Sequence, residues 1–239
     1  MKPNLSAPKP RGRRPSVEDF DVREHMLDTA TRLFAERGIA ATTVAQIAGE
    51  AGVTSAMVHY YFTNREQLLD AVVDERLARV VEFVWRPVEH ETGNDPFANA
   101  LELVERLFDV TARMPWLPPL WMREIVNEGG LLRERMLKRI PLEHVKRFAA
   151  RVQEAQQAGT VNPGLEPVYL FHSILALVML PLATSKIWQS ARGLPRLDRD
   201  LLHRHVRALL AYGMQVPEAS SARAAAKANA NASALRRKP

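Results

Sequence analysis

Residues 41–69 read ATTVAQIAGEAGVTSAMVHYYFTNREQLL, and this stretch decides how the chain is interpreted. Apolar residues recur at helical spacing on both sides of Gly52, which breaks the pattern. The spacing predicts two short helices, Val44–Ala51 and Thr54–Phe62, joined by a tight turn at Gly52-Val53. Two short helices joined in this way are typical of a helix-turn-helix motif.

Polar residues stand at the start of these two helices and of the next one: Thr43, Thr54 and Asn64. Thr43 and Gln46 have the spacing of a capping box, in which the hydroxyl accepts a hydrogen bond from a backbone N–H and the Gln side chain accepts one in return. Asn64 and Gln67 repeat this spacing. We therefore expect all three residues to cap helices, a role they would have in any helical protein, with DNA contact as an added role.

The second helix of a helix-turn-helix lies in the DNA major groove and presents its N-terminal residues to base edges. Small residues at that end, Ser55 and Ala56, allow close approach to the DNA. Further along, His59, Tyr60 and Tyr61 supply hydrogen-bonding groups. Tyr61 could instead pack against the protein, and His59 taken alone would be an ordinary exposed histidine. The motif therefore predicts a DNA-binding unit whose recognition helix begins near Thr54.

Four runs around the motif match a known family in unbroken order: LFAERG (33–38), TTVAQIA (42–48), AGVT (51–54) and VHYYFTNREQLL (58–69). Over about 50 residues, near a fifth of its length, the chain resembles the TetR family of bacterial transcriptional regulators. Two positions depart from the family's pattern. His59 stands where the family often has Tyr, and Tyr61 where it often has His, so the base preference of relatives does not transfer.

The resemblance implies a role for each matching residue. The backbone around Thr43 would meet a phosphate through the free N–H groups of a helix start. The first residues of the recognition helix would face bases, Tyr60 would contact phosphate or sugar, and Arg65 would grip a phosphate. The predicted DNA-binding set is Thr43, Thr54, Ser55, Ala56, Met57, His59, Tyr60, Tyr61 and Arg65, together with Arg11, Arg13 and Arg14 of the N-terminal arm.

Positive charge is concentrated at the two ends of the 239-residue chain, whose net charge is +6. Residues 1–16 carry +5 and residues 217–239 carry +4, so the body between them is slightly negative. Residues 21–65 hold four arginines against five carboxylates. Because phosphate contacts supply much of the affinity for DNA, we expect the arm at residues 1–16 to help by entering the minor groove. A solubilising disordered tail is the alternative interpretation of this arm.

Outside the motif the chain reads as helices nearly throughout, so the predicted fold class is all-α. An N-terminal DNA-binding domain of three helices is expected over residues 17–64, and a long connecting helix over 65–86. A larger helical domain for ligand binding and dimerisation would follow over 87–216. Residues 1–16 would form a disordered basic arm, and residues 217–239 a disordered Ala-rich basic tail.

Proline and glycine indicate the remaining helix boundaries. Helices are expected at about 20–37 with Gly38 at its end, from 95 to about 114, and in a short stretch between Pro118-Pro119 and Gly129-Gly130. Further helices are expected at 131–140 and 141–158, or as one helix kinked at Pro141, and at 167–190 and 198–214. The connecting helix would reach roughly 30 Å. Residues 167–185 carry no formal charge and approach the length of a membrane span. Because His172 and Pro181 interrupt the run, a buried helix is the better interpretation.

A helix over residues 167–190 that is apolar on nearly every side needs cover on more than one side. Together with the amphipathic helix at 198–214, it is expected to form a four-helix interface with a two-fold mate. A monomer's central core helix is the alternative. The predicted dimer interface is Leu170, Ile174, Leu177, Val178, Leu202, Val206 and Leu209.

Large apolar residues between the connecting helix and the predicted dimer helices suit a ligand pocket. The predicted ligand-binding set is Trp85, Phe108, Met114, Trp116, Trp121, Met122, Phe148 and His172. Any one of the apolar residues could be plain core instead. His172 could be a satisfied core histidine rather than a polar anchor for a ligand.

The sequence carries no signature of catalysis or of a metal site. It contains no Cys, and it lacks a His-Glu-x-x-His pair, a Gly-rich phosphate loop and a Gly-x-Ser-x-Gly elbow. We therefore expect neither an enzyme nor a cofactor, and the N-terminus, without an apolar signal segment, favours the cytoplasm.

These features, taken with the resemblance, predict a ligand-responsive transcriptional regulator. In its most concrete form it is a repressor that binds double-stranded operator DNA as a homodimer and is released by a small, mostly apolar effector, without a membrane partner. A protein that compacts DNA without sequence preference and a helical dimerisation adaptor are the rival interpretations.

Overall fold

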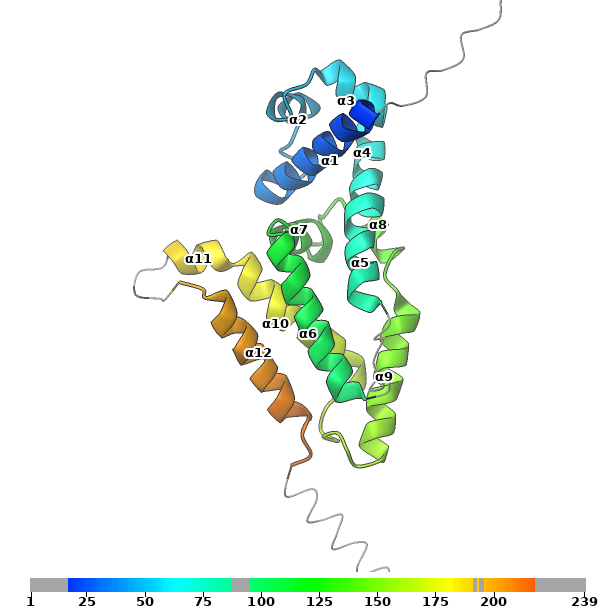
Figure 1. Cartoon of the computed structure of the whole chain (residues 1–239), viewed down its shortest axis with the longest axis vertical. Coiled ribbons are helices and arrows are strands. Elements are labelled where there is room, and N and C mark those ends of the chain that lie inside the picture. The colour runs from blue at the N-terminus through cyan, green and yellow to red at the C-terminus, as the bar shows by residue number, and fades with distance from the viewer. Residues whose placement is uncertain (1–16, 87–94, 191–192, 194–195, 218–239) are drawn as a thin grey trace, which may run out of the picture.

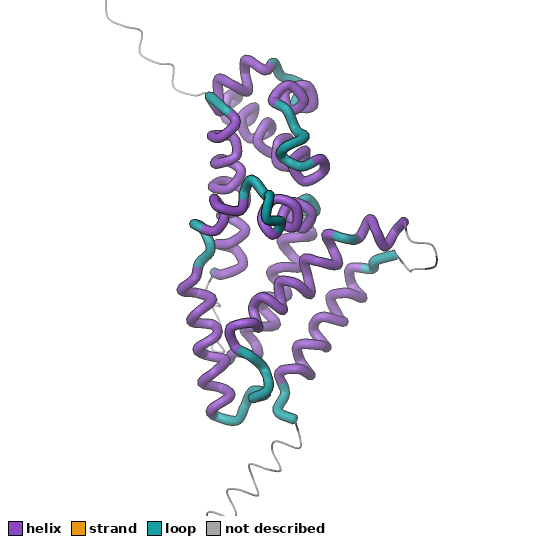
Figure 2. The backbone as a smooth tube through the Cα atoms, turned by 180° about the vertical axis from the view of Figure 1, so that it is seen from behind, coloured by secondary structure: helices purple, strands orange, loops and turns teal. Residues whose placement is uncertain are grey.

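The structure is a computed structural model, which describes residues 17–86, 95–190, 193 and 196–217. Every regular element in these described residues is a helix, which confirms the predicted all-α class (Figure 1). Figure 2 shows the same arrangement from behind, with a small helical unit at one end and a larger helical domain at the other. The predicted arm and most of the predicted tail lie outside the described residues.

The small unit consists of α1 (Val17–Arg37), α2 (Val44–Glu50) and α3 (Ser55–Phe62). Its core is formed by apolar residues of α1, among them Leu27, Leu33 and Phe34, which pack with Ile47 of α2. Gly38, the predicted end of this helix, follows α1 with φ +87, a left-handed conformation that glycine adopts easily. The backbone N–H of Gly38 donates to the Phe34 carbonyl (2.9 Å), which closes the end of the helix.

The caps predicted from the sequence are present at all three helix starts. The Thr43 hydroxyl accepts from the Gln46 backbone N–H (3.2 Å), and the Gln46 side chain accepts from the Thr43 N–H (2.8 Å), so the capping box is complete. Thr54 accepts from the Met57 N–H (3.2 Å). Asn64 accepts from the Gln67 N–H (2.9 Å). These bonds satisfy N–H groups that have no partner within a helix.

The connecting segment differs from the single α-helix that the sequence predicts. It consists of α4 (Arg65–Val72), a π-helical stretch η1 (Val73–Leu77) and α5 (Ala78–Trp85). A π turn holds more residues than an α turn, so it shifts the buried face of the helix. Val73, Arg76 and Leu77 of this stretch are buried. Apolar spacing alone does not reveal such a change of pitch.

The helical domain contains α6 (Pro96–Arg113), α7 (Leu117–Trp121), the π-helical η2 (Met122–Val126), α8 (Arg133–Leu137) and α9 (Leu142–Gln157). It continues with α10 (Pro167–Ala183), α11 (Ser185–Ser190) and α12 (Arg199–Met214). In Figure 1, α4 and α5 run from the small unit into this domain, where α6, α10 and α12 lie side by side. None of the described helices is long and apolar enough to cross a membrane.

Three predicted boundaries are corrected in this domain. Pro118 and Pro119 lie inside the first turn of α7 rather than before it, because N–H groups there have no helical partner to lose. The helix expected at 131–140 shortens to Arg133–Leu137. The long apolar helix expected at 167–190 ends at Ala183, where Thr184 separates it from α11.

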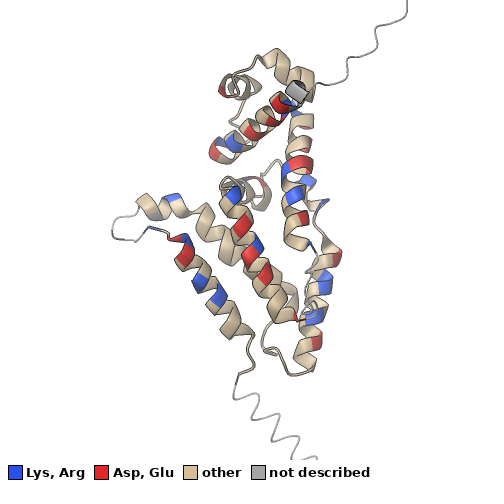
Figure 3. Cartoon of the chain, viewed as in Figure 1, with Lys and Arg blue, Asp and Glu red and all other residues tan. Residues whose placement is uncertain are grey.

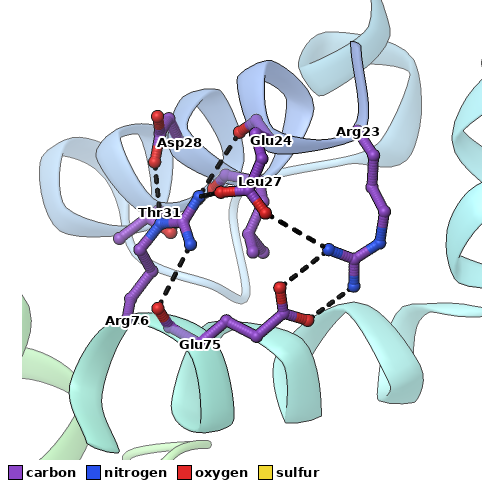
Figure 4. A network of polar contacts seen from close by, with 7 residues as sticks. All are labelled: Arg23, Glu24, Leu27, Asp28, Thr31, Glu75 and Arg76. Carbon is purple, nitrogen blue, oxygen red and sulfur yellow. Dashed lines mark hydrogen bonds and ion pairs between the residues drawn. The ribbon is translucent and has the colours of Figure 1, made fainter. Parts of the chain in front are cut away.

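A polar network joins α1 to the connecting segment (Figure 4). Arg23 of α1 makes two hydrogen bonds to the Glu75 carboxylate, at 2.7 and 2.5 Å. Arg76 bonds Glu24 (2.7 Å) and Asp28 (2.7 Å) through two different nitrogens. The orientation of the small unit on the connecting segment is therefore held by charged groups as well as by apolar packing.

Replacing Glu75 with Gln is expected to flatten the acid side of the stability curve. Hydrogen bonding to the Arg23 guanidinium lowers the pKa of the Glu75 carboxyl below its ordinary value. Stabilisation by such a group is present above the unfolded-state pKa, near 4.3, and is lost as the pH falls through the folded-state pKa. Urea unfolding between pH 6 and pH 3 should show a steeper loss for the wild type than for Glu75→Gln. Equal slopes would contradict this assignment.

Candidate functional site

The predicted recognition helix, α3, presents its leading residues to solvent. Thr54, Ser55, Ala56, Met57 and His59 are all exposed. Tyr60 is 78% exposed. Tyr61 is half-buried and meets the Tyr60 ring edge-on at 5.1 Å. The face that was predicted to approach DNA is therefore open to it.

The opposite face of α3 fixes the helix on its support. Val58 and Phe62 are buried among residues of the small unit, and α3 packs against α2. The Arg23 guanidinium lies over the Phe62 ring, 5.1 Å from its centre. A short helix gains little stability by itself, so this burial is what holds α3 in place. The support leaves the leading end of α3 free to dock.

Arg65 has a different immediate role from the phosphate grip that the resemblance implies. It is half-buried, and its guanidinium donates to the Ile39 carbonyl in the loop between α1 and α2. Just before it, Thr63 adopts φ +47, an uncommon conformation for a residue with a side chain. Arg65 thus braces the start of α4, and contact with phosphate stays a prediction.

The small unit offers little free positive charge, and α3 has no Lys, Arg, Asp or Glu (Figure 3). Arg32 is occupied by two carboxylates, Glu50 at 2.7 Å and Glu36 at 3.4 Å. This agrees with the sequence count of four arginines against five carboxylates. Arg11, Arg13 and Arg14, which were predicted to supply the missing charge, lie outside the described residues.

A buried carboxylate joins the small unit to the helical domain. Glu124 of η2 is buried, and one of its oxygens accepts from the Ile39 backbone N–H (2.9 Å) just after α1. The other oxygen accepts from the Leu131 N–H (3.2 Å). Gly130 allows this close fold, because a Cβ there would lie 2.3 Å from the Glu124 carbonyl oxygen. Glu124 therefore connects η2 directly to the loop that precedes α2.

A cavity of about 210 Å³ lies between the end of α5, α6 and α9. Of the predicted ligand-binding residues, Trp85 and Phe148 line it together. The sequence reasoning missed its polar lining, which includes Arg86, Arg106, His144, Arg147 and Arg151. A signal was available on α9, where 144, 147, 148 and 151 share one face of a helix.

The other predicted ligand-binding residues do not join this cavity. Phe108 is buried between α6 and α12, with its ring 4.7 Å from that of His203. Met114 and Trp116 line a separate groove between α1 and the helical domain. Trp121 and Met122 are half-buried at the α7–η2 junction. His172 is exposed on α10, so the prediction of a polar anchor inside a buried helix is wrong for the single chain.

The predicted dimer interface lies partly on the wrong face of α10 and α12. Leu170, Ile174, Val178 and Val206 are buried inside the chain itself, and a second copy could not reach them. Leu177 and Leu202 are half-buried, whereas Leu209 is 46% exposed. The large apolar residues that these helices leave exposed are Val168, Tyr169, Leu180, Leu201, Leu209 and Tyr212. Burial follows the side that faces α6 and α9, which helix periodicity alone does not identify.

Two short helices joined by a tight turn, capped at both starts and exposed along the second, define the class of helix-turn-helix proteins. Within this class, residues 26–72 match the family model described as bacterial regulatory proteins, tetR family. The predicted resemblance to the TetR family is thereby confirmed.

Sequence relatives are transcriptional regulators. HTH-type transcriptional regulator TtgR of Pseudomonas putida is 33% identical over 97 residues, covering 41% of this chain and 46% of its own. HTH-type transcriptional repressor KstR2 of Mycobacterium tuberculosis is 36% identical over 86 residues, covering 36% of this chain and 40% of its own. The chain thus spans less than half the length of these relatives.

Solved structures extend the similarity of fold to the helical domain. The ketosteroid transcriptional regulator KstR2 of Mycobacterium tuberculosis superposes with a TM-score of 0.64 at 18% identity, covering 82% of this chain and 95% of its own. FadR of Bacillus subtilis, solved in complex with stearoyl-CoA, gives 0.60 at 20% identity, with 80% and 98% covered. Both comparisons support an N-terminal helix-turn-helix followed by a larger helical domain.

Proposed function

We propose that this chain is a transcriptional repressor that binds operator DNA as a homodimer in the bacterial cytoplasm and releases it when a small molecule binds the helical domain. The observation that carries the proposal is α3: a capped helix that is buried on one face and open on the other. Ser55, Ala56 and Met57 would face bases, while Thr43, Thr54 and Tyr60 would contact the DNA backbone. The proposal further holds that the chain is not an enzyme.

The contacts between the two parts of the chain suit a regulator. Glu124 links η2 to the loop before α2, and Arg135 of α8 bonds Asp70 of α4 at 2.6 Å. An effector that favours a shifted connecting segment would move the recognition helices out of register with the grooves. Shifting a population from 1:99 to 99:1 takes about 5.5 kcal/mol of differential affinity, which a ligand bound within the helical domain can supply.

The direct test is binding to the DNA upstream of the chain's own gene, followed by fluorescence anisotropy. Specific binding should survive an excess of random duplex at physiological salt, because specific complexes are typically at least a thousandfold tighter than non-specific ones. If random duplex displaces the operator, the result would favour a protein that compacts DNA without sequence preference. Absence of any DNA binding would leave a dimerisation adaptor and overturn the proposal.

Deletion of residues 1–16 is expected to weaken operator binding and to flatten its salt dependence. The small unit has no basic excess of its own, and each phosphate contact contributes about 0.9 to the slope of log K against log salt. Anisotropy titrations from 50 to 300 mM salt would measure both quantities. An unchanged slope would reject a DNA-binding role for the arm.

The dimer is proposed on the exposed apolar face shared by α10 and α12. Tyr169 and Leu180 of α10 and Leu201, Leu209 and Tyr212 of α12 are exposed in the single chain. Large apolar patches of this kind mark interaction surfaces, and an operator with two half-sites calls for two copies. A two-fold axis through this face that runs along the long axis of the molecule would place the two α3 helices at the same end of the assembly (Figure 1).

Leu209→Glu is expected to shift the protein from dimer to monomer in size-exclusion chromatography with light scattering. In a two-fold interface both copies carry the substituted residue, so the free-energy cost of burying the charge arises twice. Leu142→Glu is the matched control, since Leu142 is a similarly exposed leucine on α9. A dimer that persists in Leu209→Glu, or that is lost equally in Leu142→Glu, would place the interface elsewhere.

A further inference from the structure

The recognition helix carries none of the side chains that most often identify a base through two hydrogen bonds. In the major groove, guanine is recognised by Arg or Lys and adenine by Asn or Gln, while Asp or Glu accepts from cytosine. Residues 54–62 read TSAMVHYYF and contain none of these six residue types, so Figure 3 shows no charged residue on α3. Direct recognition of bases by α3 therefore depends on other groups.

The side-chain amides of Gln46 and Asn64, which lie on either side of α3 in the sequence, are committed to helix caps. The Gln46 side-chain oxygen accepts from the Thr43 N–H (2.8 Å), and the Asn64 side-chain oxygen accepts from the Gln67 N–H (2.9 Å). A bidentate contact with adenine uses the oxygen and the amino group of one amide together. Neither side chain can make this contact with its full geometry while it caps a helix.

His59, one turn further along α3, is held toward the end of the helix. Its ring Nδ1 lies 3.3 Å from the Thr63 carbonyl oxygen. Since a carbonyl oxygen only accepts, Nδ1 carries the proton, and Nε2 of the neutral ring is then an acceptor. In this state the ring offers no donor to the guanine acceptors N7 and O6. Contact with bases is thus left to the first residues of the helix.

Ala56 and Met57 make the leading end of α3 a small apolar surface. Both residues are exposed in the first turn, and the Met57 backbone N–H is occupied by the Thr54 hydroxyl at 3.2 Å. Among the described residues Met57 is the one exposed methionine, with 37% of its surface accessible. A thioether side chain is flexible and polarizable, so it adapts well to an irregular apolar partner.

Thymine is the base that presents an apolar group in the major groove. Its 5-methyl group lies there beside O4, whereas the other three bases present hydrogen-bond donors and acceptors. We propose that Ala56 and Met57 recognise thymine through this methyl group, so that each operator half-site carries thymine where the first turn of α3 enters the groove. The inference rests on the proposed function and specifies which base the recognition helix reads.

Deoxyuridine in place of thymidine tests the proposal, because it removes the 5-methyl group and keeps O4 and the base pair. Footprinting of the full chain on the DNA upstream of its own gene defines the half-sites, and each thymine is then replaced in turn. At least one replacement in each half-site should weaken binding about fourfold in fluorescence anisotropy, the loss expected for one buried methyl group. Replacing the symmetric pair should weaken binding about fifteenfold, because a homodimer reads both half-sites.

A flat response would overturn the proposal: if every replacement leaves the affinity unchanged, no methyl group is read. The 5-methyl group lies in the major groove, so a contribution of residues 1–16 in the minor groove would not respond to deoxyuridine. The measured loss therefore reports on the helix in the major groove and leaves the arm's role to the deletion described above.

Met57→Gln connects the methyl contact to one side chain. Both residues are unbranched and of similar helix propensity, so the fold should be unchanged, but an amide at this position favours adenine. The variant should lose the response to deoxyuridine at one position of each half-site and should prefer adenine there. Such a switch of preference cannot arise from misfolding.

Leu137→Gln is the matched control, because Leu137 of α8 is an apolar residue that is 55% exposed. This variant should keep the wild-type response at every position. An unchanged response to deoxyuridine in Met57→Gln, or an equal change in Leu137→Gln, would overturn the assignment to Met57.

Operator binding itself keeps the two proposals apart. If the chain binds a specific operator whose affinity does not respond to deoxyuridine, thymine recognition fails and the repressor stands. If the chain binds no DNA specifically, the repressor fails and thymine recognition fails with it.

Discussion

Ala56→Glu is expected to weaken operator binding by about a hundredfold while leaving the fold intact. Ala56 is exposed in the first turn of α3, the end that would face base edges in the major groove. A carboxylate placed there would lose solvation and meet the phosphate field, and unfavourable contacts at one base position cost about 1–3 kcal/mol. Fluorescence anisotropy on the operator fragment measures the change directly.

The control for this variant adds the same charge elsewhere. Ala112 is an exposed alanine on α6, in the helical domain. Ala112→Glu should bind the operator within about twofold of the wild type, and both variants should unfold at the wild-type temperature, because exposed alanines on helices tolerate glutamate with little loss of stability. If Ala56→Glu binds the operator as tightly as the wild type, α3 is not the recognition helix.

Short-range signals explain why the small unit could be predicted closely. Thr43, Thr54 and Asn64 each satisfy backbone N–H groups within three residues, and Gly38 takes its left-handed conformation at the helix end. Such caps are decided by neighbours in sequence, so a single chain is enough to identify them. The exposure of α3 follows from the same pattern, because Val58 and Phe62 define its buried side.

Long-range packing explains what the sequence could not predict. In sequence, both faces of α10 are apolar and cannot be told apart. In the structure, Ile174 is buried against the chain's own helices and Tyr169 is exposed. Only the position of α6 and α9 decides between these faces. The lining of the cavity was predicted only in part for a related reason, because large apolar residues were taken as the sign of a pocket, whereas arginines on α9 form much of the lining. The spacing of apolar residues did not predict the two π-helical stretches.

Arg76→Met is expected to lower the free energy of unfolding by about 2 kcal/mol. The Arg76 side chain is only 8% exposed, and it bonds Glu24 and Asp28 of α1 and the Glu75 carbonyl (3.1 Å) at once. Removing one partner of a fully buried pair typically costs 3–5 kcal/mol, because a buried charge is left uncompensated. The loss is smaller here since Asp28 is 67% exposed and water can solvate it. Urea denaturation at pH 7 measures the change.

Arg79→Gln is the matched control for this experiment. Arg79 is an exposed arginine three residues further along the same helical segment, and its removal should change stability by no more than about 0.5 kcal/mol. An equal loss in the two variants would mean that net charge, rather than the contacts of Figure 4, stabilises the junction.

A second substitution tests the reason for the loss. In the Arg76→Met background, the one cation left near Glu24 among the described residues is the Arg23 guanidinium at 3.6 Å. Glu24→Gln should therefore recover part of the lost stability by removing a poorly compensated carboxylate. In the wild-type background the same Glu24→Gln change should instead be destabilising, because it removes the partner of Arg76. Such a reversal of sign would be specific to coupled charges. Because this network orients α1 on the connecting segment, operator affinity in the Arg76→Met variant should fall even at temperatures where the chain stays folded.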